Sequence, residues 1–321
     1  MGKLLVTGAL GQIGTELSVV LAERYGLERV IASDIKDKVS DSIPDEISYY
    51  RLDVLDFDAL RKIVKENNVE IIFHMAALLS AVAESNPQKA WKVNVDGLYN
   101  VLEVAREFGC GVFFPSSIGA FGPSTPKNKT PQVTIQRPTT VYGISKLTGE
   151  LLCDYYFRKY GIDTRGLRFP GLISYKTLPG GGTTDYAVEI FYEAVKKGKY
   201  TCYLSRDTRL DMMYMPDAIT AIIKLMEADG SKLKNRNAYN VTSMSVTPEE
   251  IAASIRRFMP NFEIEYEVDV VRQSIADSWP DSLDDSCARA EWGWQPEYSL
   301  ERMTKDMLEK VSLKLKKMEE K

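Results

Sequence analysis

Short apolar runs alternate with longer stretches of helical periodicity along the first half of the chain. Between the apolar runs, apolar residues recur at a spacing typical of helices, for example at 56–67 and from Asn86-Pro87 to Phe108. Strands that alternate with helices predict an α/β fold of the Rossmann type, a doubly wound parallel sheet that binds ligands at the carboxyl ends of its strands. The runs that predict strands are 3–7, 30–34, 48–52, 69–74, 112–114 and 164–169.

The pattern changes after Pro170, where the loops become longer and the elements shorter and mixed. We therefore expect 1–169 to form the large Rossmann domain and 170–321 mainly a smaller lobe over its ligand. The stretch 214–226 is expected to return to the large sheet. The last stretch, 299–321, predicts an amphipathic and increasingly basic helix whose lysines form a solvated face.

A glycine-rich turn joins the first predicted strand to the first helix. Gly8 permits a tight turn, Gly11 lets the backbone approach a pyrophosphate, and Gly14 lets the helix pack close to the strand. The N–H groups at the helix start and the helix dipole favour the negative charge of the phosphates. We therefore predict a dinucleotide site along this turn, at Gly8, Leu10, Gly11, Gln12, Ile13 and Gly14.

Asp34 ends the second predicted strand about 20 residues after Gly14, where a carboxylate accepts hydrogen bonds from the adenosine ribose. The same carboxylate repels a 2′-phosphate, so NAD is expected rather than NADP. Lys36 and Lys38 stand close enough to leave NADP open as an alternative. The other interpretation of this region is a structural turn in which Asp34 is only a cap.

Two further strand ends offer cofactor contacts. Asp53-Val54 follows the third strand and could contact the adenine, although Asp53 could instead cap the helix at 56–67. Ala76 and Ala77 follow the fourth strand, and their small side chains leave room for a cofactor.

Tyr142 and Lys146 lie four residues apart, so on a helix they share one face. A cation near a phenol stabilises tyrosinate and lowers the phenol's pKa, which suits Tyr142 to act as a general base. The positive nicotinamide ring of NAD would add to this effect, and Lys146 could donate to the nicotinamide ribose. Such a pair alone is usually a solvated helix face, but here it follows a glycine turn, an acid-tipped strand and Ser116-Ser117 at another strand end.

The composition excludes several other classes of protein. The 321 residues are 44% hydrophobic and 27% charged, and a net charge of −4 gives no electrostatic support for binding nucleic acid or an anionic membrane. No apolar run is long enough to span a membrane, and because the first predicted strand begins at Lys3 we expect no signal peptide. The cysteines are scattered and His74 is the only histidine, so we expect no metal site and a reducing cytoplasm.

The glycine turn, Ser117 and Tyr142-x-x-x-Lys146 resemble the extended short-chain dehydrogenase/reductase superfamily, over essentially the whole chain. The stretches 167–174, 179–187 and 209–219 resemble, within it, the short-chain-type, zinc-independent L-threonine 3-dehydrogenases. This resemblance implies hydride transfer from C3 of L-threonine to NAD, giving 2-amino-3-oxobutanoate and NADH. Tyr142 would be the general base, Ser117 would orient the hydroxyl and Lys146 would tune Tyr142.

The resemblance also implies roles near the nicotinamide. Phe169, with Pro170, would pack against the ring. Ser116 is the rival of Ser117, since alternation along a strand points only one of them into the site. Phe121 stands where many epimerases have tyrosine, and the missing hydroxyl argues against a sugar substrate.

Residues after the fourth strand and in the smaller, substrate-binding lobe could contact the substrate. Ser80 could reach it or be an ordinary loop serine. Thr183 and Thr184 follow three glycines that could act as a hinge, and Asp185 could face the substrate ammonium or cap the next helix, with capping favoured. Trp279 could cover the pocket or belong to the core. His74 fits a buried strand end better than an acid–base group.

Two other functions remain open. A nucleotide-sugar epimerase or dehydratase would use the same machinery, whereas a non-enzymatic NAD sensor would not need the tuned phenol of Tyr142. By resemblance, the helices at 88–108 and 145–160 would pair across a two-fold axis into a four-helix bundle, which implies a homodimer.

Overall fold

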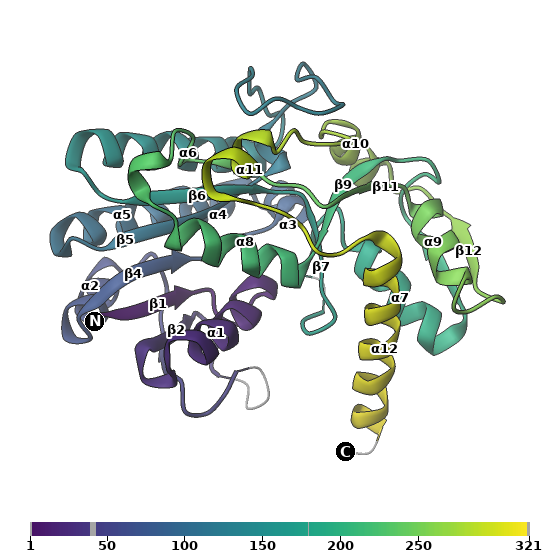
Figure 1. The fold of residues 1–321 in the computed structure, drawn as a ribbon, viewed down its shortest axis with the longest axis horizontal. Helices are drawn as coiled ribbons and strands as arrows, with labels where there is room; N and C mark the ends of the chain where they lie inside the picture. The colour runs from purple at the N-terminus through teal and green to yellow at the C-terminus, as the bar shows by residue number, and fades with distance from the viewer. Residues whose placement is uncertain (1, 39–42, 179, 320–321) are drawn as a thin grey trace.

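The computed structural model describes residues 2–38, 43–178 and 180–319 (Figure 1). Pro179, within the predicted glycine loop, lies outside these residues. Over the described part of the chain, the main sheet has seven parallel strands in the order β10-β6-β5-β4-β1-β2-β3. They are β1 (Lys3–Thr7), β2 (Val30–Asp34), β3 (Ser48–Arg51), β4 (Val69–His74), β5 (Gly111–Ser117), β6 (Thr164–Phe169) and β10 (Tyr239–Asn240).

All six predicted strands are therefore confirmed, as is the doubly wound α/β fold. The chain runs outward from β1 through β2 to β3 and then returns to the other side of β1 with β4. The strand order thus reverses between β1 and β4, and a reversal of this kind opens a crevice at the carboxyl ends of the strands.

Separate apolar cores cover the two faces of the main sheet (Figure 1). Leu17, Ile222 and Trp294 are buried in the core on one face, and Leu60 and Leu102 in the core on the other. The first face is covered by α1 (Gln12–Tyr25), α8 (Met215–Glu227) and α11 (Ser286–Trp292), the second by α2 (Phe57–Glu66), α5 (Gly97–Phe108) and α6 (Val141–Tyr160).

The long helix expected at 86–108 has an irregular first half. It follows α3 (Ser80–Ser85) and consists of α4 (Pro87–Trp91), a π-helical turn at Lys92–Asp96 and then α5. The π turn shifts the helical register, which a pattern of apolar residues does not reveal.

Later segments both build a second lobe and return to the main sheet. The expectation for 214–226 is met by α8, which packs on the sheet with α1, whereas the strand that joins the sheet is β10, which the sequence pattern did not predict. The lobe contains β7 (Gly171–Ile173), β9 (Leu210–Tyr214) and β11 (Met244–Val246) in one sheet, β8 (Lys199–Cys202) with β12 (Glu263–Tyr266) in another, and α7 (Tyr186–Lys197), α9 (Pro248–Arg256), α10 (Val270–Asp277) and α12 (Leu300–Glu319). Short 3-10 turns lie at Leu27–Arg29, Ile118–Ala120 and Gly230–Lys232. No helix in the described ranges is long and apolar enough to cross a membrane.

Candidate active site

A cavity of about 570 Å³ opens at the carboxyl ends of β1, β2, β4, β5 and β6, between the main sheet and the segment that follows β7. Every residue predicted for cofactor or substrate binding lines it, from Gly8 in the first turn to Trp279 in the second lobe. The fold therefore brings together residues from most of the length of the chain.

The end of the cavity near α1 fits a diphosphate. Gly8 has a φ of 63°, and a Cβ on Gly14 would lie 2.2 Å from the Gly8 carbonyl oxygen, so the turn and helix pack as closely as predicted. Gly11 precedes the helix without a side-chain cap, and the first turn contains no acidic residue. The side-chain nitrogen of Gln12 is buried and has no partner among the described residues. These donors leave the helix start open to an anion.

Asp34 holds the glycine turn in place. Its Oδ2 accepts from the Leu10 N–H at 3.0 Å, and its Oδ1 accepts from the Lys36 N–H at 3.2 Å. The carboxylate also lines the cavity, so the capping and the ribose-binding interpretations are compatible. Lys36 lines the cavity too, whereas Lys38 is paired with Asp45 at 3.0 Å.

The alternative in which Asp53 caps the following helix is wrong. Asp56 is the cap of α2, since its side chain accepts from the Ala59 N–H, whereas Asp53 accepts from the Leu55 N–H. Asp53 and Val54 line the cavity beside the adenine end of the predicted site.

Tyr142 and Lys146 lie one turn apart near the start of α6, and both are buried. Thr140 caps this helix by accepting from the Gly143 N–H at 3.0 Å. Ser117 accepts from the Gly119 N–H at 3.1 Å, and its hydroxyl lies near the Tyr142 phenol, whose pKa it lowers. Ser116 instead donates its hydroxyl to Glu150, so Ser117 is the serine that faces Tyr142.

Burial raises the pKa of Tyr142, and the neighbouring Ser117 hydroxyl opposes this. Lys146 is not what shifts this pKa in the structure, so its predicted tuning of the phenol during turnover stays a prediction. The Lys146 ammonium donates to the Pro115 carbonyl oxygen at 2.7 Å and lies 5.6 Å from the centre of the Tyr142 ring. Burial lowers the pKa of Lys146 to about 8, against the attraction of Glu150.

His74 is buried at the end of β4, as expected. Its Nδ1 lies 3.0 Å from the Thr7 hydroxyl, and its Nε2 has no partner in the described chain. Burial, followed by the charge of Lys146, lowers the pKa of His74 to about 3. A neutral imidazole that does not line the cavity is unsuited to acid–base work at this site.

The predicted substrate residues make more contacts with one another than expected. The hydroxyls of Ser80 and Thr183 lie 3.1 Å apart, and the Thr183 N–H donates to the Ser80 hydroxyl at 3.2 Å. Thr184 is half-buried, and its hydroxyl has no hydrogen bond within the described residues. Trp279 belongs to the core of the second lobe and also lines the cavity.

The favoured capping role of Asp185 is wrong. Its side chain makes no cap bond to α7. Instead, Oδ2 accepts from the N–H groups of Gly181 at 2.9 Å and Gly182 at 2.7 Å, because the glycine loop folds back over the carboxylate. Asp185 also lines the cavity, so it fastens the loop from inside the site.

Asn94 has a role that sequence reasoning missed. It lies on the π turn, where its Oδ1 accepts from the Leu78 N–H at 2.7 Å and its Nδ2 donates to the Leu78 carbonyl oxygen at 3.0 Å and to the Ser145 hydroxyl at 3.2 Å. The loop after β4 is thereby fixed to α6. The asparagine within an otherwise helical stretch is the only signal in the sequence, and it does not reveal the π turn.

Fold and site together define a Rossmann-type enzyme of the short-chain dehydrogenase class. The sequence profile of the NAD dependent epimerase/dehydratase family matches residues 4–242, and the chain belongs to this family and uses NAD. An uncharacterized epimerase/dehydratase of Staphylococcus saprophyticus is 56% identical, over 98% of this chain and 99% of that protein.

Solved structures of threonine dehydrogenases are also similar. L-threonine dehydrogenase from Clostridium difficile superposes with a TM-score of 0.95 and 57% identity, over 98% of each chain. The holo form of a GalE-like L-threonine dehydrogenase from Cupriavidus necator gives 0.93 with 52% identity, over 96% of this chain and 99% of that one. Its apo form gives 0.83 with 48% identity, over 97% and 100%.

Proposed function

We propose that this chain oxidises L-threonine at C3 with NAD, forming 2-amino-3-oxobutanoate and NADH. The observation that carries the proposal is the placement of Ser117, Tyr142 and Lys146 in the same cavity as the dinucleotide turn. The similarity to threonine dehydrogenases of known structure supports the choice of substrate.

The proposed chemistry divides between Tyr142, Ser117 and Lys146. NAD, when bound, supplies the acceptor for the hydride and a positively charged ring near the phenol. Ser117 orients the C3 hydroxyl of the substrate through a hydrogen bond, and Tyr142 removes the hydroxyl proton as the carbonyl forms. Lys146 stabilises the ionised phenol by its charge and donates to the nicotinamide ribose.

The contacts of the glycine loop at 180–182 support a closing motion of this loop over the substrate. Gly180 approaches Leu79, and a Cβ on Gly181 would lie 2.6 Å from Val82, so the loop packs against the start of α3. We propose that this contact, with the Ser80–Thr183 hydrogen bond, is the closed arrangement, which excludes water from the reacting atoms.

The test is a direct assay of the purified protein with NAD and L-threonine, followed by the absorbance of NADH. NADH formation that requires both compounds is the expected result. Interconversion of nucleotide sugars without net NADH would favour the epimerase alternative. Binding of NAD with neither reaction would favour a sensor.

We also propose a homodimer in the cytoplasm. Large apolar side chains on the outer side of the α4–α5 and α6 helices are exposed, among them Tyr99, Leu151 and Tyr155. Pairing of these helices with those of a second copy would bury the exposed surface in a four-helix bundle. The four cysteines are free, which suits a reducing compartment. A monomeric mass by analytical ultracentrifugation for the parent, unchanged by Leu151→Glu, would contradict the dimer.

A further inference from the structure

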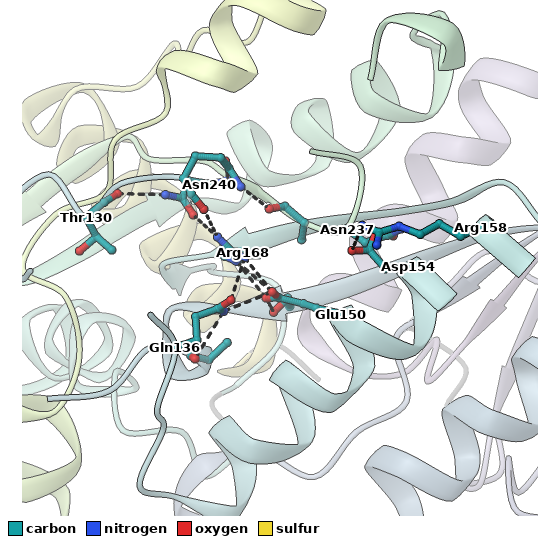
Figure 2. Close-up of polar contacts among 12 residues, drawn as sticks. Thr130, Gln136, Glu150, Asp154, Arg158, Arg168, Asn237 and Asn240 are labelled. Carbon is teal, nitrogen blue, oxygen red and sulfur yellow. Dashed lines mark hydrogen bonds and ion pairs between the residues drawn. The ribbon is translucent and has the colours of Figure 1, made fainter. Parts of the chain in front are cut away.

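A buried ionic network centred on Glu150 and Arg168 joins α6 to β6 (Figure 2). Tyr142, Lys146 and Glu150 follow one another at four-residue intervals on α6, so the three side chains share one face of the helix, and all three are buried. Glu150 has no part in the chemistry described above. Glu150 nevertheless lies one helical turn after Lys146 on α6, so its role needs an explanation.

The Glu150 carboxylate is surrounded by donors from three other parts of the fold (Figure 2). Arg168 of β6 donates from Nε to Oε1 at 3.0 Å and from Nη2 to Oε2 at 2.8 Å, which makes a bidentate ion pair. Gln136 donates to Oε2 at 3.2 Å, and Ser116 of β5 donates to Oε1. With its hydrogen bonds satisfied, a buried carboxylate can remain charged.

Arg168 is held just as firmly. Its Nη1 donates to the Gln132 carbonyl oxygen at 2.8 Å and to Oδ1 of Asn240 at 3.2 Å, and its guanidinium lies 5.0 Å from the centre of the Phe121 ring. Asn240 belongs to β10, the strand that returns to the main sheet late in the chain. The position of Glu150 is therefore set by β5, β6, β10 and the loop before α6.

The charge of Glu150 acts on Lys146. Burial lowers the pKa of the Lys146 ammonium to about 8, and the attraction of Glu150 opposes this effect. His74 of β4 is neutral above its pKa of about 3, Tyr142 has a raised pKa, and the cation of Arg168 is paired with Glu150. The other elements packed against α6 also carry charged groups. Glu84 of α3 accepts from the Val141 N–H, and Lys89 of α4 lines the cavity. Asp96 of the π turn is exposed, and Glu103 of α5 is bonded to Arg106 and Tyr156.

We propose that Glu150 is a positioning residue of the active site: its carboxylate keeps Lys146 in the charged form beside Tyr142 and engages the Ser116 hydroxyl, so that Ser117 alone faces the phenol. Arg168 holds the carboxylate in place for both tasks. This inference rests on the proposed function, in which a charged Lys146 assists Tyr142.

Two variants separate the charge of Glu150 from its shape. Glu150→Gln keeps the shape and removes the charge, whereas Glu150→Asp keeps the charge and shortens the side chain. Nuclear magnetic resonance of ¹³C-labelled lysine follows the titration of Lys146 in the protein without cofactor or substrate, and the signal is assigned by its loss in Lys146→Met. In the parent protein, Lys146 is expected to titrate with a midpoint near pH 8.

We expect Glu150→Gln to lower this midpoint by about one pH unit or more, the usual effect of a nearby opposite charge. Glu150→Asp should stay close to the parent, because the charge is retained. In the threonine assay, Glu150→Gln should lose most of its turnover at neutral pH, and Glu150→Asp should retain more. A purely structural role predicts no change in the Lys146 midpoint with either variant.

Asp163→Asn is the matched control. Asp163 precedes the first residue of β6 and pairs with Arg165 at 2.7 Å and with Arg236 at 2.8 Å, whereas Arg168 lies near the other end of the strand. This variant also breaks an ion pair to a buried arginine, but it should leave the Lys146 midpoint unchanged.

A folded Glu150→Gln protein with an unchanged Lys146 midpoint would overturn the proposal. If that variant fails to fold, the double variant Glu150→Gln with Arg168→Gln removes both buried charges and leaves no arginine unpaired. The same fall in midpoint is expected there, and its absence would count equally against the proposal. Because the titration needs no threonine, failure of the proposed function would show only in the activity assay.

Discussion

The two ends of the cavity are built in different ways. At the cofactor end, the turn from Gly8 to Gly14 and Asp34 come from one continuous strand–helix–strand unit, and the contacts are made largely by the backbone. At the substrate end, Ser80, Tyr142 and Thr183 come from segments far apart in the chain, and their contacts are made by side chains.

This difference determines which polar groups are left for a ligand. In the described part of the chain, no side chain caps the start of α1 and the side-chain nitrogen of Gln12 has no partner, so donors remain. At the substrate end, Ser80 binds Thr183 and Asp185 binds the glycine loop, so much of the polar chemistry stabilises the loop itself. Substitutions at Tyr142 and Thr184 should therefore distinguish residues that act on the substrate from residues that only stabilise the loop.

The largest effect is expected from Tyr142→Phe, which removes the acid–base oxygen and keeps the ring. Turnover should fall by roughly two to four orders of magnitude, the usual range for a positioned general base, while NAD still binds by calorimetry. Tyr186→Phe is a suitable control, because the Tyr186 hydroxyl is buried, has no partner among the described residues and does not line the cavity. Near-normal turnover of Tyr142→Phe would place the base elsewhere.

Lys146→Met should weaken NAD binding and move the pH optimum upward. Tyrosinate would lose its nearest cation, so the pKa of Tyr142 rises and the acidic limb of the rate profile shifts by about one pH unit or more. The Lys146 ammonium points to the Pro115 carbonyl oxygen in this structure, so the shift also measures its interaction with the phenol during turnover. Lys146→Arg, which keeps a cation, should shift the profile less, and an equal shift would argue against the electrostatic role.

Asp34→Ala tests the cofactor end. Loss of hydrogen bonds to a charged group should weaken NAD binding roughly tenfold or more. The ratio of the affinity for NAD to the affinity for NADP should also fall. Asp34→Asn can still accept from the Leu10 N–H, so it should keep the turn and lose mainly the charge. Equal affinity of the parent for NAD and NADP, measured by calorimetry, would contradict the assignment of Asp34.

Gly181→Pro tests closure of the loop. Gly181 has a φ of 95° and donates its N–H to Asp185, and proline permits neither. Turnover should fall by about tenfold, with a smaller change in the Michaelis constant for NAD, when initial rates are measured against each substrate. Unchanged rates would indicate that the loop has only a structural role.

The smallest effect is expected from Thr184→Ala. Removal of one hydrogen bond to the substrate should raise the Michaelis constant for threonine about fivefold and leave that for NAD unchanged. Thr184→Ser keeps the hydroxyl and serves as the control. If Thr184→Ala has the same Michaelis constant for threonine as the parent, other residues bind the amino and carboxylate groups of the substrate.

The sequence by itself determined the main sheet and the cofactor end. Strand bounds such as Lys3–Thr7 and Val69–His74 follow from local apolar runs, and the dinucleotide turn is complete within one βαβ unit. Even Ser117 and Lys146 could be located, because strand ends and helix faces follow from local periodicity.

Only the tertiary structure decided how side chains from distant segments pair. The turn of the Gly181 loop onto Asp185, the bond between Ser80 and Thr183, and the orientation of Lys146 towards the Pro115 carbonyl oxygen depend on packing between elements. The seventh strand, Tyr239–Asn240, is also too short to leave a periodic signal, and it is set by its register with β6. Hydrogen bonds at a fixed distance require atomic positions, which a pattern of residue types does not contain.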